Sequence, residues 1–405
     1  MSESTGNAVL LGYASRDAEA GKSIEEVRAS GVEVRFDHRE RLPGNGILRK
    51  LRLGGASLIV TFPAAFATGA AQAWPPHKLS DTGLYRDAVT FAIAGGVRPF
   101  SPQYPLWTDG ATKLRWVSLP KGGTIDAKDP AAWRFPVGTR FWKQFSFGDR
   151  RVETRYIEKA GKDTWLFAAY VWSEDQREAT LAPAATGLKN HIEIAPGVRH
   201  NIPSVSDCKA CHEGKGRDSV LGYGALQLSS DRDPLAPHAE SAPAGGLDLD
   251  ALLKEKRIRN APPSWRTAPP VIAAASPRAR AILGYLHANC SSCHNDQDPV
   301  ASVGLSLRAS LTASNGAAQP AMSTAVGVRS KSQIRDVAPE HCMRLAPGDI
   351  ERSSLVVRMR VRDGISQMPP LGSKLADGVA LQLISDWVRE ELPSAESPQH
   401  LESKR

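Results

Sequence analysis

The chain has 405 residues, of which 41% are hydrophobic and 23% are charged, and its formal net charge is +8. This length permits two or three domains with a large core, and the composition excludes an intrinsically disordered chain. The 51 lysines and arginines are scattered and do not interleave with aromatic residues, so we do not expect nucleic acid as a partner.

Residues 1–73 are expected to be a leader followed by a signal peptide. The basic cluster Arg49-Lys50-Leu51-Arg52 precedes an apolar run from Leu53 to Ala67 and the small-residue triplet Ala71-Gln72-Ala73. This order is typical of a secretory signal with its cleavage site. Because a signal normally starts near the N-terminus, we expect translation to begin near Val32, Val34 or Ile47. The alternatives are an uncleaved membrane anchor or a buried helix.

Residues 74–200 are predicted to form an antiparallel β domain, either a sandwich or a partial barrel. Alternating apolar residues separated by Gly, Pro and Asp turns indicate its strands. The predicted strands are Lys113 to Leu119, Thr139 to Phe147, Arg151 to Ile157 and Trp165 to Trp172. The tryptophans of this region are expected to be core residues rather than a binding platform.

Residues 201–270 are predicted to bind a first haem through Cys208-Lys209-Ala210-Cys211-His212. This is the C-x-x-C-H pattern of covalent haem attachment. Two thiols form thioethers with the two vinyl groups on one porphyrin edge, and the adjoining histidine supplies the proximal nitrogen to iron.

The sixth ligand of the first haem is harder to predict. No methionine lies between His212 and Cys290, so the ligand is expected to be a histidine, a methionine further along the chain, or absent, and His200 and His238 rank first. If neither binds, the iron is open and an enzymatic role becomes possible.

Residues 271–392 are predicted to form a cytochrome c domain with a second haem on Cys290-Ser291-Ser292-Cys293-His294. Ser276 and Pro277 predict the start of its first helix, and Asp377 predicts the cap of its last helix. These two helices are expected to cross, with Gly284 allowing their close approach. Residues 393–405 are expected to be a frayed tail.

Met368 is the predicted sixth ligand of the second haem. It lies in Gln367-Met368-Pro369-Pro370-Leu371-Gly372, between His294 and the last predicted helix. A thioether sulfur is a soft ligand that suits haem iron, and the prolines stiffen the loop that presents it. The alternative is a core methionine beside a turn.

Zinc is the main alternative ligand for the paired cysteines. Zinc ribbons place their C-x-x-C pairs about 15–20 residues apart, whereas Cys208 and Cys290 are much further apart and both pairs carry a trailing histidine. Two haems c are therefore the predicted cofactors. The fifth cysteine, Cys342, is expected to be a small buried side chain.

Several motifs make the chain similar to a poorly characterised family of bacterial periplasmic di-haem c-type cytochromes. The motifs are Leu106 to Gly110, Phe135 to Thr139, Ile202-Pro203, Tyr285 to Cys290 and Met368 to Gly372. The resemblance covers roughly residues 85–392. Such proteins are sometimes associated with soluble quinoprotein dehydrogenases, which implies a periplasmic dehydrogenase as the redox partner.

The predicted fold class is multidomain, an N-terminal antiparallel β domain followed by mainly α cytochrome c-like haem domains. The predicted function is periplasmic electron transfer through the two haems, with no stable transmembrane span after signal cleavage. One alternative is a di-haem peroxidase-like oxidoreductase with an open iron at the first haem. Another is a binding module whose β domain docks a dehydrogenase.

Overall fold

The structure is a computed structural model that describes residues 75–213, 220–297 and 300–392, together with the backbone of three strands nearer the N-terminus. The chain divides into two compact units, Met1–Trp74 and Pro75–Arg405. In the first unit β1 (Val34–Arg41), β2 (Ile47–Leu53) and β3 (Ala56–Thr61) form an antiparallel sheet. The strand β3 lies within the predicted signal core, and the predicted cleavage triplet lies outside the described residues.

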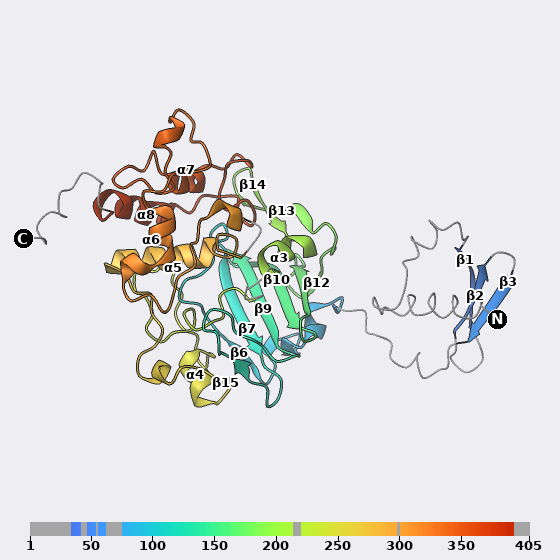
Figure 1. Ribbon diagram of the computed structural model, residues 1–405. Helices are drawn as coiled ribbons and strands as arrows, with labels where there is room; N and C mark the ends of the chain where they lie inside the picture. The colour runs from blue at the N-terminus through green and yellow to red at the C-terminus, as the bar shows by residue number, and fades with distance from the viewer. Residues whose placement is uncertain are drawn as a thin grey trace, which may run out of the picture. The chain divides into compact units, whose positions relative to one another are not determined.

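A six-stranded antiparallel sheet with the order β12-β11-β10-β9-β7-β6 forms the centre of the second unit (Figure 1). Its strands are β6 (Val97–Pro99), β7 (Thr112–Ser118), β9 (Arg140–Phe147), β10 (Arg150–Lys159), β11 (Trp165–Trp172) and β12 (Ala179–Leu181). The four predicted strands are confirmed. They share one sheet, however, so the expected sandwich or barrel is wrong for the described residues.

The other strands of the second unit pair two by two. These pairs are β4 (Tyr85–Asp87) with β5 (Ala92–Ile93), β13 (Leu188–Ala195) with β14 (Val198–Ile202), and β8 (Ile125–Asp126) with β15 (Ile258–Arg259). The last pair is parallel. It joins the predicted first haem segment, residues 201–270, to the β part of the chain.

The sheet register follows from alternating side chains and a tight turn. Gly148 has a φ of 56° between β9 and β10, where Phe147 pairs with Arg150 across a two-residue connection that favours glycine. Successive residues therefore alternate between the two faces of the sheet. One face buries an aromatic core that includes Trp142, Tyr156 and Tyr170. The opposite face carries Lys113, Arg115 and their cross-strand neighbours.

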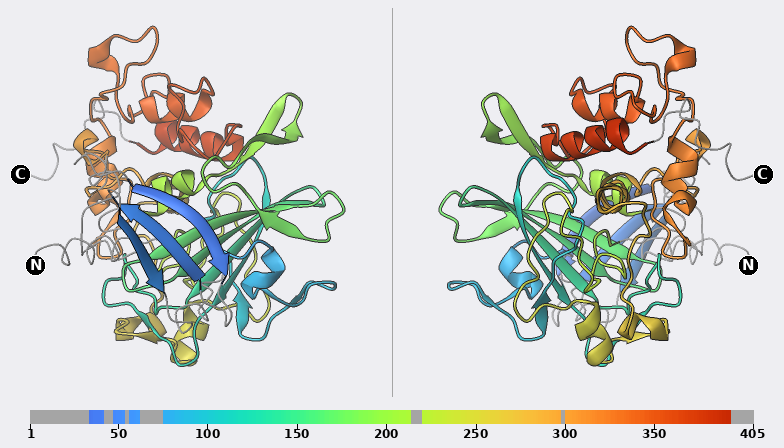
Figure 2. Two further views of the ribbon diagram at one scale, coloured as in Figure 1. Left: turned by 90° about the vertical axis from the view of Figure 1, so that its right-hand side faces the viewer. Right: turned by 90° about the vertical axis from the view of Figure 1, so that its left-hand side faces the viewer.

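Six α-helices complete the described part of the second unit. They are α3 (Val205–His212), α4 (Leu249–Lys254), α5 (Pro277–Cys290), α6 (Pro320–Ala325), α7 (Ser354–Arg360) and α8 (Gly378–Glu390). Single 3-10 turns occur at Leu79–Thr82, Pro263–Arg266, Ala301–Val303, Gly316–Ala318 and Pro339–His341. Helices α7 and α8 lie at one end of the unit and α4 at the other, with the sheet between them (Figures 1 and 2).

The predicted fold class is wrong, because the structure is mostly β-sheet and only 23% helical. The region after residue 270 is not mainly α. Only α5, with 14 residues, and α8, with 13, are long in this region. Between them the chain is interrupted by Pro and Gly, which break helices. The guanidinium of Arg344 instead holds the loops by donating to the carbonyls of Val303, Gly304 and Thr324.

Candidate functional site

The first C-x-x-C-H motif lies within α3. The helix begins with a capping box, in which the amide of Asp207 donates to Ser204 Oγ (3.1 Å) and the amide of Ser204 donates to Asp207 Oδ2 (2.9 Å). Cys208, Cys211 and His212 follow at helical positions i, i+3 and i+4, which lie on one face of a helix. This face therefore presents two thiols and an imidazole in the same direction.

Helix α3 packs against β11 on the side of the sheet that carries Arg155. The imidazole of His212 lies against the ring of Phe167, with ring centroids 5.5 Å apart. Burial raises the pKa of Cys208 to about 11, although the positive charge of Arg155 acts in the opposite direction. Arg155 in turn interacts electrostatically with both Cys208 and Cys211. A group attached at this motif would therefore lie near that guanidinium.

His200, a predicted sixth ligand, lies on β14 in a buried charged cluster. Its Nε2 is 3.0 Å from Glu153 Oε1, and Glu153 also receives two hydrogen bonds from Arg155, at 2.6 and 3.1 Å. Glu153 is fully buried. Burial alone would raise the pKa of Glu153, but Arg155 and the hydrogen bond with His200 lower it to about 2, so the carboxylate is charged.

His238, the other predicted sixth ligand, lies beside the cap of α8. Its Nε2 is 2.9 and 3.0 Å from the two carboxylate oxygens of Asp377, and its ring is 4.8 Å from that of Trp107. His200 and His238 thus each have one ring nitrogen bonded to a carboxylate. Metal-bound imidazoles commonly have this arrangement and coordinate through the other nitrogen. Which of the two binds the first haem stays a prediction.

The second C-x-x-C-H motif stands at the end of α5. The helix begins where Ser276 Oγ accepts from the amide of Ala279 at 3.0 Å, with Pro277 in the first turn, so the predicted start is confirmed. After Cys290 the chain turns once more, and the amides of Cys293 and His294 both donate to the Cys290 carbonyl, at 3.1 and 2.9 Å. The three side chains of this motif also share one helical turn.

His294, the histidine of the second motif, has a buried ring nitrogen. Its Nδ1 is buried and has no hydrogen-bond partner within the described ranges. Burial lowers the pKa of His294, and the charges of Arg358 and Arg344 lower it further. The imidazole is therefore neutral at neutral pH, the form in which it binds iron. Burial also raises the pKa of Cys290 to about 12, which is consistent with a thiol in an apolar surrounding.

The Met368 loop lies near His294 through a shared neighbour. The amide of Met368 donates to the carbonyl of Arg358 at 2.8 Å, and Arg358 is one of the two arginines whose charges act on His294. The side chain of Met368 is half-buried. In contrast, Met359 is 6% exposed and belongs to the hydrophobic core. Packing therefore explains this side chain, and a bound metal is not needed to explain it.

Helices α5 and α8 pack together as predicted, and their apolar side chains belong to one core. Asp377 caps α8 by accepting from the amide of Ala380 at 3.1 Å. The prediction for Gly284 is wrong, because this residue does not mediate the contact between the two helices. It faces the ring of Tyr104, which comes from the loop before β7.

The motif Leu106 to Gly110 connects the β part of the chain to the second haem motif. The amide of Trp107 donates to Asn289 Oδ1 at 2.7 Å, and Asn289 directly precedes Cys290. Asp109 Oδ1 accepts from the amides of Lys374 and Leu375, at 2.7 and 2.8 Å. These two residues follow the Met368 loop, so one motif positions both sides of the predicted second haem site.

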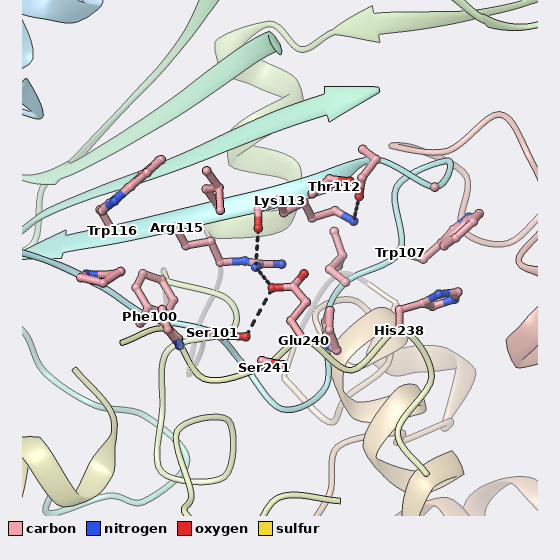
Figure 3. A pocket seen from close by; sticks show the side chains of 17 residues that line it. Phe100, Ser101, Trp107, Thr112, Lys113, Arg115, Trp116, His238, Glu240 and Ser241 are labelled. Atoms are coloured by element: carbon pink, nitrogen blue, oxygen red, sulfur yellow. Dashed lines mark hydrogen bonds and ion pairs between the residues drawn. The ribbon is translucent and has the colours of Figure 1, made fainter. Parts of the chain in front are cut away.

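A pocket of about 450 Å³ lies between β7 and the loop that contains His238 (Figure 3). Trp107 and His238 line one end, and Phe100 and Trp116 line the other. Arg115 and Glu240 face each other inside it, 2.5 Å apart. The basic residues Lys113, Arg115, Lys143 and Arg155 are not recognisable as a group from the sequence. In the sequence, the alternation of side chains along three strands is the only feature that connects these residues. It shows that they share one face of the sheet only when the register of the strands is known.

The two haem motifs do not combine into one metal centre. Over residues 75–213, 220–297 and 300–392, no three His, Cys, Asp or Glu side chains converge as ion ligands.

Cys342 is 1% exposed, which confirms the predicted small buried side chain. In the same part of the chain we find no helix with the length and apolarity required to cross a membrane.

Comparisons with known proteins do not assign the chain to a family. No protein-family model, curated protein or solved structure matches it at a significant level.

Proposed function

We propose that the chain is a periplasmic electron-transfer protein with two covalently bound c-type haems, which accepts electrons from a dehydrogenase. The observation that carries this proposal is the local geometry of the two motifs. Each places two thiols and a histidine within one helical turn, and this is the arrangement that thioether attachment and proximal coordination require.

The positions of the cysteines favour haem over zinc. A structural zinc site takes four ligands in a tetrahedron, and the two C-x-x-C pairs would have to meet to supply four thiolates. In the described part of the chain they do not form such a group. The neutral imidazole of His294 also suits a proximal ligand.

Each residue has a separate role in this proposal. Haem, when bound, supplies reversible one-electron chemistry at iron. Cys208 and Cys211 hold the first group and Cys290 and Cys293 the second, while His212 and His294 provide proximal nitrogens. Met368 would hold the second iron through its thioether sulfur. A His/Met pair raises the reduction potential and leaves no open position there.

The test is a pyridine haemochrome assay on protein exported by a strain that attaches haem c. We expect two haems per chain, one in the double variant Cys208→Ser/Cys211→Ser, and one in Cys290→Ser/Cys293→Ser. The control Cys342→Ala should keep both, since this cysteine is outside the motifs. A wild-type product with no haem, or with stoichiometric zinc, would contradict the proposal.

A further inference from the structure

Four basic side chains gather on one face of the sheet, on the side where α3 lies. Arg115, Lys143 and Arg155 are directly opposite one another on β7, β9 and β10, because Lys143 pairs with Arg115 on one side and with Arg155 on the other. Lys113, two residues before Arg115, is on the same face. Like charges in directly opposite positions destabilise a sheet, so this row requires negative charge.

Two glutamates of the protein supply only part of the negative charge that this row requires. Arg115 pairs with Glu240 (2.5 Å) and Arg155 pairs with Glu153 (2.6 Å). For the two lysines we find no ion pair among the residues that the structure describes. The ammonium of Lys113 donates to the Ala111 carbonyl at 2.9 Å. The charge of Asp109 also acts on Lys113, but Asp109 Oδ1 already accepts from two backbone amides.

Lys143 is held by aromatic rather than anionic contacts. Its Nζ lies 4.9 Å from the centroid of Phe145, and the guanidinium of Arg155 lies 4.4 Å from the same ring. Burial lowers the pKa of Lys143 well below its usual value, and the charges of Arg115 and Lys113 lower it further. Burial likewise lowers the pKa of Lys113 to about 8. Both ammonium groups would be stabilised by an anion.

The row also offers unused hydrogen-bond donors. Arg115 is 5% exposed, and its Nη2 is buried with no partner in the described part of the chain. Figure 3 shows the guanidinium of Arg115 inside the pocket, with Lys113 beside it. At the other end of the row, Arg155 is close enough to interact electrostatically with both thiols of α3. The basic row therefore extends from the pocket to the first haem motif, and the charge without an ion pair lies on Lys113 and Lys143.

We propose that Lys113, Arg115 and Lys143 bind the two propionates of the haem attached to α3, with Arg155 beside the thioether edge. A porphyrin held by Cys208 and Cys211 carries its two carboxylates on the edge away from the thioethers. Two carboxylates match the two lysines that lack an ion pair. This inference rests on the proposed function, and it adds that the sheet, rather than a helical cytochrome domain, binds the propionate edge of the first haem.

The expected consequence is a higher reduction potential at the first haem only. A positive charge near iron favours the reduced state, which is the less positive of the two. For a unit charge at about 10 Å and an effective dielectric constant of about 20, the effect on the reduction equilibrium is about tenfold, which corresponds to about 59 mV for one electron.

The test is a potentiometric titration of the exported di-haem protein carrying Lys143→Gln. We expect about a tenfold lower equilibrium constant for reducing one haem and no change at the other. Lys143→Arg, which keeps the charge, should remain near wild type. Lys162→Gln, an exposed lysine in the turn between β10 and β11, is the matched control and should change neither potential. Met368→Ala identifies the second haem, so the shifted haem can be assigned.

The possible outcomes separate this inference from the proposed function. If Lys143→Gln carries two haems and neither potential moves, or if the potential of the Met368-dependent haem moves instead, the propionate assignment is wrong and the di-haem proposal stands. If wild-type protein contains no haem, both are wrong.

Discussion

The ring of Tyr104 lies directly over Gly284, in the space that any larger residue at this position of α5 would need. A Cβ on Gly284 would overlap the ring atoms Cδ1, Cε1 and Cζ. The hydroxyl of Tyr104 donates to Asp233 at 3.0 Å, which fixes the ring in place. This contact joins the loop before β7 to the helix that ends at the second haem motif.

Replacing Gly284 with Ala should destabilise the protein by about 1–3 kcal/mol, because an extra methyl in a packed interior forces neighbours to shift. Chemical denaturation of the holoprotein measures this free energy. The matched control is Gly378→Ala, in the first turn of α8, where an added Cβ meets nothing within 4 Å. This control should be neutral or slightly stabilising. Equal effects of the two substitutions would argue against the Tyr104 contact.

Replacing Met368 with Ala should lower the potential of one haem and remove the sulfur-to-iron absorbance band, since the second iron loses its thioether ligand. Spectroscopy combined with potentiometry tests this. Met359→Leu is the control, because Met359 is a core side chain. This control should leave the band and both potentials in place and cost less than about 1.5 kcal/mol of stability. If the Met368→Ala variant retains the band, Met368 is not the sixth ligand of the second iron.

Replacing Asp109 with Ala should loosen the segment that follows the Met368 loop, because two amide hydrogen bonds to a charged group are lost. Such bonds contribute about 1.5–3 kcal/mol. We expect a loss of stability of that order and a weaker sulfur-to-iron band. Asp109→Asn is the informative comparison, since asparagine retains the acceptor oxygen and tolerates the φ of 49° found here. It should lie close to wild type, and an Asn variant as impaired as the Ala variant would contradict this role of the Asp109 acceptor oxygen.

His287 on α5 should make the protein acid-sensitive. Burial, aided by the charge of Arg308, lowers the pKa of His287 to about 4, and the amide of Ala309 donates to its Nδ1 at 3.3 Å. A histidine whose folded pKa is depressed contributes stability above its unfolded pKa of about 6.5, and this is lost as pH falls towards the folded value.

The expected loss between about pH 6.5 and 4 is on the order of 2 kcal/mol. His287→Asn places an amide oxygen near the position of Nδ1 and cannot titrate. Its unfolding free energy should therefore vary less over this pH range than that of the wild type. Parallel pH profiles for the two proteins would show that His287 is not the group responsible.

Local signals in the sequence predicted more of the structure than long-range ones did. Ser276 and Asp377 cap their helices as expected, because a cap depends on a few neighbouring residues. The role of Gly284 was not predictable in the same way, since its partner Tyr104 is far away in sequence.

The basic row was missed for a related reason. Lys113, Lys143 and Arg155 lie on three different strands, and only the register brings them together. The expected α domains were wrong because C-x-x-C-H specifies one helical turn and not the architecture around it. The remainder of the chain after α5 is instead held largely by loop hydrogen bonds, such as those from Arg344.

The most direct test of the account is the intact mass of the exported protein, combined with peptide mapping of the four motif cysteines. The account predicts a mass increase equal to two haems, with one haem on the peptide containing Cys208 and Cys211 and the other on the peptide containing Cys290 and Cys293. Four unmodified thiols at these positions, in protein that has been exported from a haem-attaching strain, would contradict it.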